Sequence, residues 1–434
     1  MDQLNRQILK LALPSIVSNI TVPLLGLVDQ AIVGHLGAAA YIGAVAVGTM
    51  IFNVVYWIFG FLRMSTSGLT SQAWGSRNLS EIVNIFIRSL LLGEAVALFF
   101  LILQRPLYLV AVALIGPSPQ LQPLVEAYFR IGIWGAPAVF GVYALTGWYV
   151  GMQNTRLPMA VSIIQVSSNV ILSLFFVFGL GMRIEGVAWG TMLSQWIGFL
   201  VMLFFWRKYY GRLARYRRPL GEVMRGEQLR RFFSVNRDIF LRTLFLVAVN
   251  LFFTSAGARQ GDLVLSVNAL LMTFSTLFSY FMDGFANAAE ALCGHSYGAS
   301  QTDVATRDRS RLLYRRLMLW GLGMAVVFSA VYFIGGKGLL RFLTNNVDVL
   351  GGAKPYLLWA SLIPLSGFAA YIFDGIFIGI TATRGMLVSS AIAALCFFTV
   401  FLIFQSSLGN HALWLAFLVF LLFRGIGQYF WLRA

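Results

Sequence analysis

The segment LALPSIVSNITVPLLGLVDQAIV, residues 11–33, has the length and composition of a helix that crosses a lipid bilayer. Such a helix needs about 20 mostly apolar residues, and this segment carries a single charged side chain, Asp29. It is also longer than the apolar part of a secretory signal peptide. We therefore expect it to be retained as the first membrane-spanning helix.

Similar segments recur along the whole chain of 434 residues, of which 59% are hydrophobic and 11% charged. Soluble domains carry about a quarter charged residues, so an ordinary soluble enzyme is excluded. The predicted spans are 11–33, 42–63, 84–104, 124–150, 158–180, 186–206, 237–257, 264–285, 314–335, 355–380, 386–406 and 411–431. The sequence thus predicts an all-α membrane protein with six-helix lobes at 1–206 and 236–434, joined by a basic connector at 207–235.

The net charge of +16 is unevenly distributed over this map. If the N-terminus is cytoplasmic, 22 Lys and Arg residues fall on the inner side and six on the outer side. Cytoplasmic loops carry the excess of basic residues, so we expect both termini in the cytoplasm. The connector is more simply a solvated loop near anionic lipid headgroups than a nucleic-acid-binding patch, and we expect no nucleic-acid partner.

The two halves contain matching motifs, which indicates an internal repeat. TSQAWGS at 70–76 corresponds to CGHSYGA at 293–299, and a Gly-x-x-x-Gly-x-x-x-Thr-Arg pattern follows the fourth helix of each half. Small residues allow close helix packing in lipid, and the arginine suits a membrane interface. We predict a parallel repeat about an axis along the membrane normal, with structural residues Gly147, Gly151, Thr155, Arg156, Gly375, Gly379, Thr383 and Arg384.

Enzymatic chemistry finds no support in the residue patterns. The three histidines are far apart in sequence, so no metal-ligand spacing is present, and no Gly-x-x-x-x-Gly-Lys-Ser/Thr phosphate-binding loop occurs. The two cysteines indicate neither a disulfide framework nor a zinc site. We expect no enzyme activity, no cofactor and no bound metal cluster.

Acidic residues inside the spans are the strongest functional candidates, because a charge in the membrane is costly unless it is paired or used. They are Asp29, Glu94, Asp283, Glu290 and Asp374. Since burial disfavours the charged form of a carboxyl group, Asp29 could exchange a proton or hold a monovalent cation. The competing interpretation is an ordinary aspartate at the membrane interface.

Residues near these acids suggest both functional and structural contacts. Pro14, Pro23 and Gly26 would loosen the helix that carries Asp29. Asn169 and Ser173 share one face of their helix, and Thr191 lies in the next helix; each could contact Asp29 or form an ordinary helix–helix hydrogen bond. Asp238 and Arg242 are four residues apart, so we expect them to pair with each other.

The opening LALPSIVSNITVPLLGLVDQAIVGHLG, TSQAWGSRN, GMQNTRLP, NRDIFLR and GNHALWLA together resemble the multidrug and toxic-compound extrusion (MATE) family, in particular its bacterial DNA-damage-inducible branch. The resemblance implies a twelve-helix exporter of the bacterial inner membrane that exchanges organic, often cationic, compounds for protons or sodium by alternating access. Asp29, Asn169 and Thr191 match the cation-coupling cluster of the first lobe. Many relatives have a second aspartate where this chain has Ser173.

These observations predict a cation-coupled antiporter, with the proton favoured because Ser173 replaces a carboxylate. Sodium stays open as the coupling ion, since Asp374 matches an acid implicated in sodium-linked relatives, and Asp283 and Glu290 are further candidates for an acidic site in the second lobe. A lipid or lipid-linked sugar flippase of the wider superfamily and a non-transporting scaffold are two competing hypotheses. The expected partners are small organic cations, the coupling ion and membrane lipids, and we expect a monomer.

Overall fold

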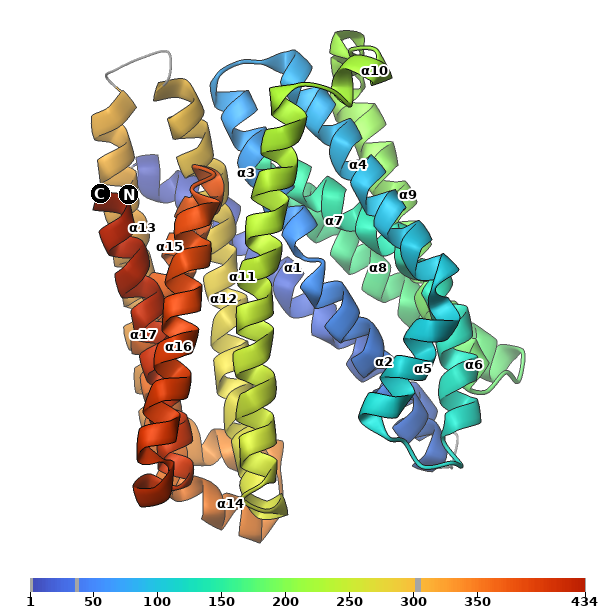
Figure 1. Ribbon diagram of the computed structural model, residues 1–434. Coiled ribbons are helices and arrows are strands. Elements are labelled where there is room, and N and C mark those ends of the chain that lie inside the picture. The colour runs from blue at the N-terminus through green and yellow to red at the C-terminus, as the bar shows by residue number, and fades with distance from the viewer. Residues whose placement is uncertain (1–2, 36–38, 301–305, 434) are drawn as a thin grey trace. The chain divides into compact units, whose positions relative to one another are not determined.

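The computed structural model describes residues 3–35, 39–300 and 306–433, and every regular element in these ranges is a helix (Figure 1). Twelve helical segments are long and apolar enough to cross a membrane, and each overlaps one predicted span. The prediction of a twelve-helix membrane protein is therefore confirmed. The segments run at Gln3–Gly34, Ala40–Gly75, Leu79–Ile102, Gln122–Gly151, Arg156–Gly179, Ile184–Tyr216, Glu227–Ala258, Asp262–Ser300, Ser310–Leu343, Val347–Gly379, Thr383–Leu408 and Asn410–Arg433.

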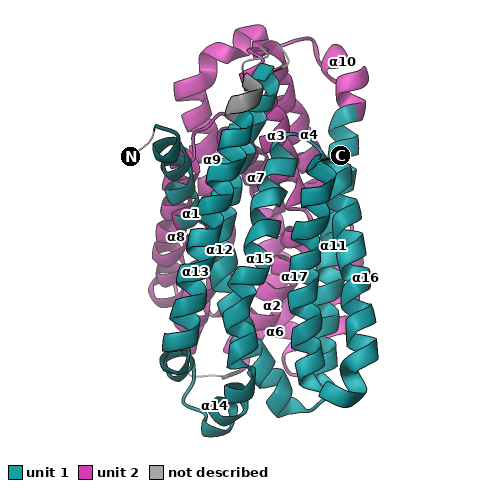
Figure 2. Cartoon of the chain, turned by 90° about the vertical axis from the view of Figure 1, so that its left-hand side faces the viewer, with its two compact units in different colours: residues 1–16, 231–434 teal, residues 17–230 magenta. Residues whose placement is uncertain are grey.

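The chain forms two compact units (Figure 2), which we call unit 1 (1–16 and 231–434) and unit 2 (17–230). The first helix, α1 (Gln3–Gly34), starts in unit 1 and ends in unit 2. The α-helices that lie wholly within unit 2 are α2 (Ala39–Ile58), α3 (Phe61–Gly75), α4 (Leu79–Ile102), α5 (Gln104–Ile115), α6 (Gln122–Gly132), α7 (Ala136–Gly151), α8 (Arg156–Leu174), α9 (Ile184–Phe205) and α10 (Leu220–Val223).

Unit 1 is built from long helices around an apolar core. The core contains Phe253, Leu271, Phe397 and Trp414, which come from four different helices. The helices are α11 (Glu227–Ala258), whose first turn still belongs to unit 2, α12 (Asp262–Ser300), α13 (Thr306–Leu343), α14 (Val347–Ala353), α15 (Leu357–Gly379), α16 (Thr383–Leu408) and α17 (Asn410–Arg433).

The glycines of the repeated motif bring helix backbones into direct contact in both units. A Cβ atom on Gly147 would lie 2.2 Å from a backbone oxygen of α3, and one on Gly375 would lie 2.4 Å from a backbone oxygen of α12. Gly151 and Gly379, one turn further along, meet the same two backbones at 2.7 Å and 2.8 Å. These four glycines thus lie at close contacts between helices, because any larger side chain would overlap the neighbouring main chain.

The turns that follow these motifs have the same backbone conformation. Gln153 has a φ of 58° and Thr381 a φ of 55°, although neither is glycine, and left-handed backbone is uncommon for such residues. In each turn the N–H of the next residue donates to the carbonyl five positions earlier, at 2.9 Å. Positions 153 and 381 are 228 apart, which is the offset of the sequence motif, so the repeat extends to backbone geometry.

The remaining motif residues differ between the copies. Thr155 and Thr383 are both buried, but only Thr383 donates a recorded side-chain hydrogen bond, to Asp238 Oδ2 at 3.1 Å. The Oγ1 of Thr155 has no hydrogen-bond partner in the part of the chain that the structure describes. Arg156 and Arg384 are exposed, and their role as anchors at a membrane interface stays a prediction.

The structure corrects the predicted end of the second span. Hydropathy predicts that this span ends at residue 63, but the helical chain continues as α3 to Gly75. Most polar side chains of α3 are buried, including Ser65, Thr66 and Ser71. Hydropathy predicts too short a span here because it counts these hydroxyl groups as polar. In the structure they are satisfied by carbonyl groups of their own helix, as Thr66 is by Leu62 O at 2.6 Å.

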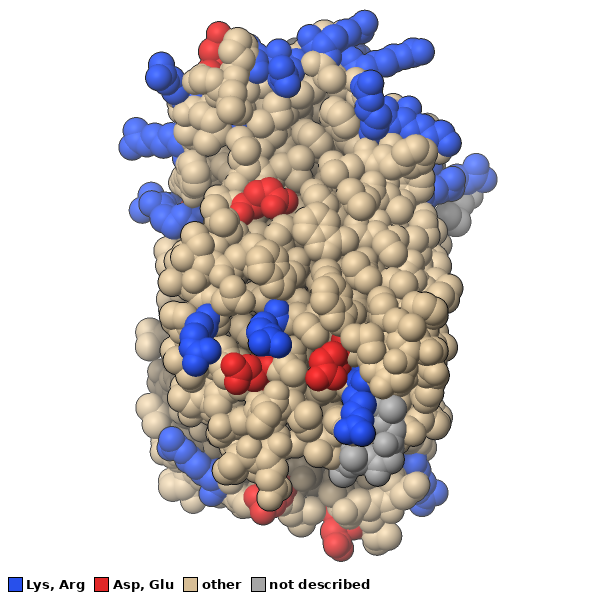
Figure 3. All heavy atoms as spheres, turned by 90° about the vertical axis from the view of Figure 1, so that its right-hand side faces the viewer, with Lys and Arg blue, Asp and Glu red and all other residues tan. Residues whose placement is uncertain are grey.

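The connector between the halves is folded against unit 2 rather than free. It contains short helical turns at 206–216 and the helix α10, seen at the top of Figure 1. Ser80 Oγ of α4 donates to Tyr216 O at 2.9 Å. The buried Arg88 donates from Nε to Val223 O at 2.8 Å and from Nη1 to Glu81 Oε1 at 2.6 Å. Figure 3 shows Lys and Arg side chains gathered at the end of the molecule that carries α10.

Candidate functional site

Asp29 lies on α1 in unit 2 and is enclosed by protein. Its relative exposure is 1%, so the side chain is not a solvated aspartate at the membrane interface. Two neutral side chains donate hydrogen bonds to its carboxylate. Asn169 Nδ2 lies 3.2 Å from Oδ1, and Thr191 Oγ1 lies 2.6 Å from Oδ2. Three residues that are distant in sequence thus meet at one point.

The three residues form a closed hydrogen-bonded triangle, which we call the Asp29 cluster. Asn169 Nδ2 also donates to Thr191 Oγ1 at 3.0 Å, so the two donors hold each other in place beside the carboxylate. Among the described residues, no lysine or arginine forms an ion pair with Asp29. The cluster can therefore stabilise the carboxylate through hydrogen bonds alone, and protonation of Asp29 would break no ion pair.

Close packing of α8 against α9 positions the cluster. Ser173, one turn after Asn169, is fully buried against Gly190, where a Cβ atom would lie 2.2 Å from the serine Oγ. Both Ser173 Oγ and Asn169 Oδ1 are buried without a hydrogen-bond partner in the described part of the chain. Two unpartnered oxygens therefore accompany the carboxylate along this face of α8.

Sequence reasoning missed Tyr128 of α6, which borders the cluster. Its side chain is 3% exposed and interacts electrostatically with Asp29, and its hydroxyl lies 3.5 Å from Thr49 Oγ1. Gly48 makes room for the ring, since a Cβ atom there would lie 2.3 Å from Tyr128 Cδ1. A tyrosine in an apolar span is ordinary, so the sequence does not indicate that Tyr128 lies beside Asp29. The neighbouring residues Gly48 and Thr49 only show that the apolar sequence of α2 is interrupted by a small and a polar residue.

The three residues predicted to bend the first helix lie at different depths in α1. The helix is continuous from Gln3 to Gly34, so Pro14 and Pro23 do not interrupt it. The unit boundary between residues 16 and 17 falls between these two prolines. Gly26 packs against α2, since a Cβ atom on this glycine would lie 3.5 Å from the methyl group of Thr49.

Asp374 of unit 1 is in a very different environment from Asp29. Arg242 and Arg424 both donate to its Oδ2, the latter at 2.6 Å, and Gln428 Nε2 donates to Oδ1 at 2.6 Å. All four side chains are buried. Asp283 of α12 interacts electrostatically with Arg242, so it belongs to the same charged cluster. Two of the predicted acids of the second lobe are thus brought together, with two arginines that counter their charge.

One expected ion pair is wrong. Arg242 does not bond to Asp238, four residues earlier; it reaches across to Asp374 on α15. Asp238 instead accepts from Arg237 at 3.0 Å and from Thr383. The local spacing is compatible with the first pairing, but Asp238 already accepts hydrogen bonds from Arg237 and Thr383. Pairing Arg242 with Asp374 therefore leaves neither of these two buried charges uncompensated.

The two remaining acids, Glu290 and Glu94, lie on α12 and α4. Glu290 is buried on α12, two turns beyond Asp283, where its carbonyl faces Gly379. Glu94 is half-buried on α4, and no hydrogen bond or ion pair of its side chain is found in the part of the chain that the structure describes. Within that part, no group of three or more His, Cys, Asp or Glu residues could hold a metal ion.

Comparison with known proteins extends these observations. The family model MatE matches residues 14–175 and 239–403, so it matches each half once. DNA damage-inducible protein F of Escherichia coli (strain K12) is 37% identical over 421 residues, which cover 96% of this chain and 89% of that protein. Multidrug resistance protein MdtK of Edwardsiella ictaluri (strain 93-146) is 24% identical and covers 89% and 84%. A crystal structure of MATE in the bent conformation superimposes with a TM-score of 0.88 at 17% identity, over 100% of this chain and 95% of that one.

Proposed function

The chain belongs to the MatE family of multidrug and toxic-compound efflux transporters, and from this premise we propose that it is a proton-coupled antiporter with Asp29 as the coupling carboxylate. Its substrates would be small amphipathic organic cations exported from the bacterial cytoplasm. The observation that carries the proposal is the Asp29 cluster, in which a buried carboxylate contacts only neutral donors. Such a group can gain and lose a proton without breaking an ion pair.

The contrast with Asp374 supports the choice of Asp29. Two guanidinium groups already donate to the Asp374 carboxylate, so a cation that binds there would meet two like charges. This arrangement disfavours the sodium site that the resemblance allows in unit 1. Asp374 is better explained as the structural partner of Arg242 and Arg424.

The proton is a better candidate than sodium for the Asp29 cluster as well. A hard cation collects several oxygen ligands, with carboxylates among them to compensate its charge. Here one carboxylate is accompanied by the neutral oxygens of Asn169 and Ser173. A proton needs only the carboxylate itself, so a single acid is sufficient.

The path of α1 suggests how protonation could affect transport. The helix that carries Asp29 begins in unit 1 and ends in unit 2, and Pro14 and Pro23 lie on either side of the boundary. Neutralising Asp29 would weaken its hydrogen bonds to Asn169 and Thr191 and free this end of α1 to bend. Substrate release would accompany that change, with both termini in the cytoplasm throughout.

Transport by purified protein in proteoliposomes tests the proposal. A fluorescent lipophilic cation is supplied, and proton and sodium gradients are imposed separately on wild type and on Asp29→Asn. Glu94→Gln is the matched control, because it removes another carboxyl group from a span of unit 2. We expect a proton gradient to drive uptake by wild type and by Glu94→Gln but not by Asp29→Asn.

Two results would contradict the proposal. Undiminished transport by Asp29→Asn would remove Asp29 from the mechanism. Transport driven by sodium and indifferent to the proton gradient would leave Asp29 in place but assign the wrong ion.

A further inference from the structure

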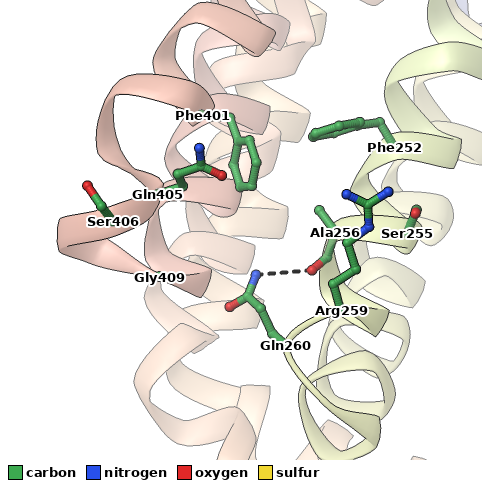
Figure 4. Close-up of a pocket in the computed structure, with 9 residues that line it drawn as sticks. All are labelled: Phe252, Ser255, Ala256, Arg259, Gln260, Phe401, Gln405, Ser406 and Gly409. Carbon is green, nitrogen blue, oxygen red and sulfur yellow. Dashed lines mark hydrogen bonds between the residues drawn. The ribbon is translucent and has the colours of Figure 1, made fainter.

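A groove of about 410 Å³ lies between the ends of α11 and α16 in unit 1 (Figure 4). One part of its lining is apolar and contains Phe252 and Phe401. The other part is polar and contains Arg259, Gln405 and Ser406. The groove therefore has two chemically distinct ends, as an amphipathic ligand requires.

The two ends match the expected depth profile of a membrane. The candidate spans of α11 and α16 end at Ala258 and Leu408, so Arg259 lies just beyond the end of its span. Phe252 is seven residues before Arg259, and Phe401 is seven residues before Leu408, which places both rings about 10 Å deeper along the helices. The backbone at Arg259 thus lies at headgroup level, and the two phenyl rings lie in the hydrocarbon.

The polar end carries an uncompensated positive charge. Arg259 is exposed, and none of the acidic side chains in the described part of the chain forms an ion pair with it. In Figure 4, Gln405 lies beside the Phe401 ring, and the Arg259 guanidinium points toward Phe252 on the other wall. Gln260 on the same wall as Arg259 is already fixed by its hydrogen bond to Ala256 O at 3.2 Å. A guanidinium is suited to bind a phosphate group through two parallel hydrogen bonds.

The turn at the base of the groove is held rigidly. Gly409 has a φ of 51°, in the left-handed region that glycine adopts readily. The next residue, Asn410, exchanges two buried hydrogen bonds with Asn268, at 2.8 Å and 2.9 Å. Trp414 Nε1 adds a third, to Asn268 Oδ1 at 3.0 Å. The groove is therefore preformed, and little conformational freedom is lost when it is filled.

The chemistry of the groove selects one class of occupant. We propose that it binds a phospholipid with an anionic headgroup, whose phosphate contacts Arg259 while an acyl chain lies along Phe252 and Phe401. The exposed Leu402 and Ile403 beside the groove offer further apolar surface to the chain. A cationic amphipath fits less well, because Arg259 would repel its charge.

Native mass spectrometry of the full-length protein in detergent tests this proposal with phosphatidylglycerol and phosphatidylcholine as probes. Arg259→Gln removes the charge, and Gln405→Trp fills the groove while it keeps the charge. Arg341→Gln is the control, because Arg341 is another exposed arginine near the end of α13. A basic residue near an anionic lipid surface contributes about 1 kcal/mol, which corresponds to about a fivefold change in affinity.

We expect wild type and Arg341→Gln to bind phosphatidylglycerol in preference to phosphatidylcholine. Arg259→Gln should bind phosphatidylglycerol about fivefold more weakly and lose the preference, and Gln405→Trp should retain less of both lipids. Equal losses in the two arginine variants would show general surface attraction and overturn the site. Two other results would overturn it as well: binding of phosphatidylglycerol by Arg259→Gln as tight as by wild type, or stronger binding of a lipophilic cation dye than of phosphatidylglycerol by wild type.

Discussion

The two buried aspartates of this transporter should lose different amounts of stability on the same substitution, Asp→Asn. Asp374→Asn removes the carboxylate that Arg242 and Arg424 share. Breaking a buried ion pair from one side costs about 3–5 kcal/mol, because the remaining charge stays buried. Asp283 offsets part of this cost through its interaction with Arg242, so we expect a loss of stability near the lower end of that range.

Asp29→Asn leaves no charge uncompensated. The donors to Asp29 are neutral, and each hydrogen bond to the ionised carboxylate contributes about 1.5–3 kcal/mol. An asparagine can still accept from Thr191 at 2.6 Å but faces the amide nitrogen of Asn169, so one of the two bonds is lost. The expected cost is about 1.5–3 kcal/mol, which is smaller than that of Asp374→Asn, while proton-driven efflux is abolished.

Thermal unfolding of the purified proteins in detergent measures the difference, and dye efflux is followed in parallel. The double variant Asp374→Asn/Arg424→Gln is the control, because it removes one positive charge together with the negative one and should recover part of the lost stability. Stability of Asp374→Asn equal to that of wild type would refute the ion-pair reasoning. A larger loss in Asp29→Asn than in Asp374→Asn would refute the comparison of the two sites.

Three further predictions concern packing, the connector and the cluster. Gly375→Ala should lower the free energy of unfolding by about 1–3 kcal/mol through overpacking against α12. Gly323→Ala should raise it by about 0.5–1 kcal/mol, because a Cβ atom at Gly323 would meet nothing within 4 Å. Unfolding curves of the two variants and wild type measure both changes. Arg88→Ala removes the donor to Val223 O, so trypsin should cut the connector faster than in wild type, and an unchanged cleavage rate would contradict the anchor. Thr191→Val should reduce proton-driven efflux about tenfold, since a hydrogen bond to a charged group contributes about 1.5–3 kcal/mol, while Thr191→Ser keeps the hydroxyl and should retain most of the activity.

The sequence predicts the twelve spans, and its family resemblance names Asp29, Asn169 and Thr191, which hydrogen bonds join in the structure. Ser173 was expected beside them, but its hydroxyl has no hydrogen-bond partner among the described residues. Apolar length alone locates the twelve helices, and helical spacing puts Asn169 and Ser173 on one face. The meeting of Asn169 with Asp29, at a separation of 140 residues, follows from the family resemblance rather than from spacing. Tyr128 is not predicted, because an aromatic residue in an apolar span is ordinary and only its contacts distinguish it.

The pairing of charges in unit 1 could not be predicted from local spacing. Arg242 and Asp238 satisfy the helical rule for side-chain pairs, yet Arg242 binds a carboxylate 132 residues away. The helical rule describes exposed surfaces, where water compensates either partner. Inside the protein, the strongest contact is the one that leaves the fewest charges uncompensated, and that choice depends on tertiary packing.

The two halves share the fold of the repeat but not the environment of their buried acids. Both units use paired glycines and left-handed turns at the same places, yet Asp29 meets neutral donors and Asp374 meets two arginines. A coupling cycle at Asp374 would have to break and reform ion pairs at a cost of about 3–5 kcal/mol on every turnover. A cycle at Asp29 exchanges only hydrogen bonds. The asymmetry of the two units therefore favours one coupling acid per chain, located in unit 2.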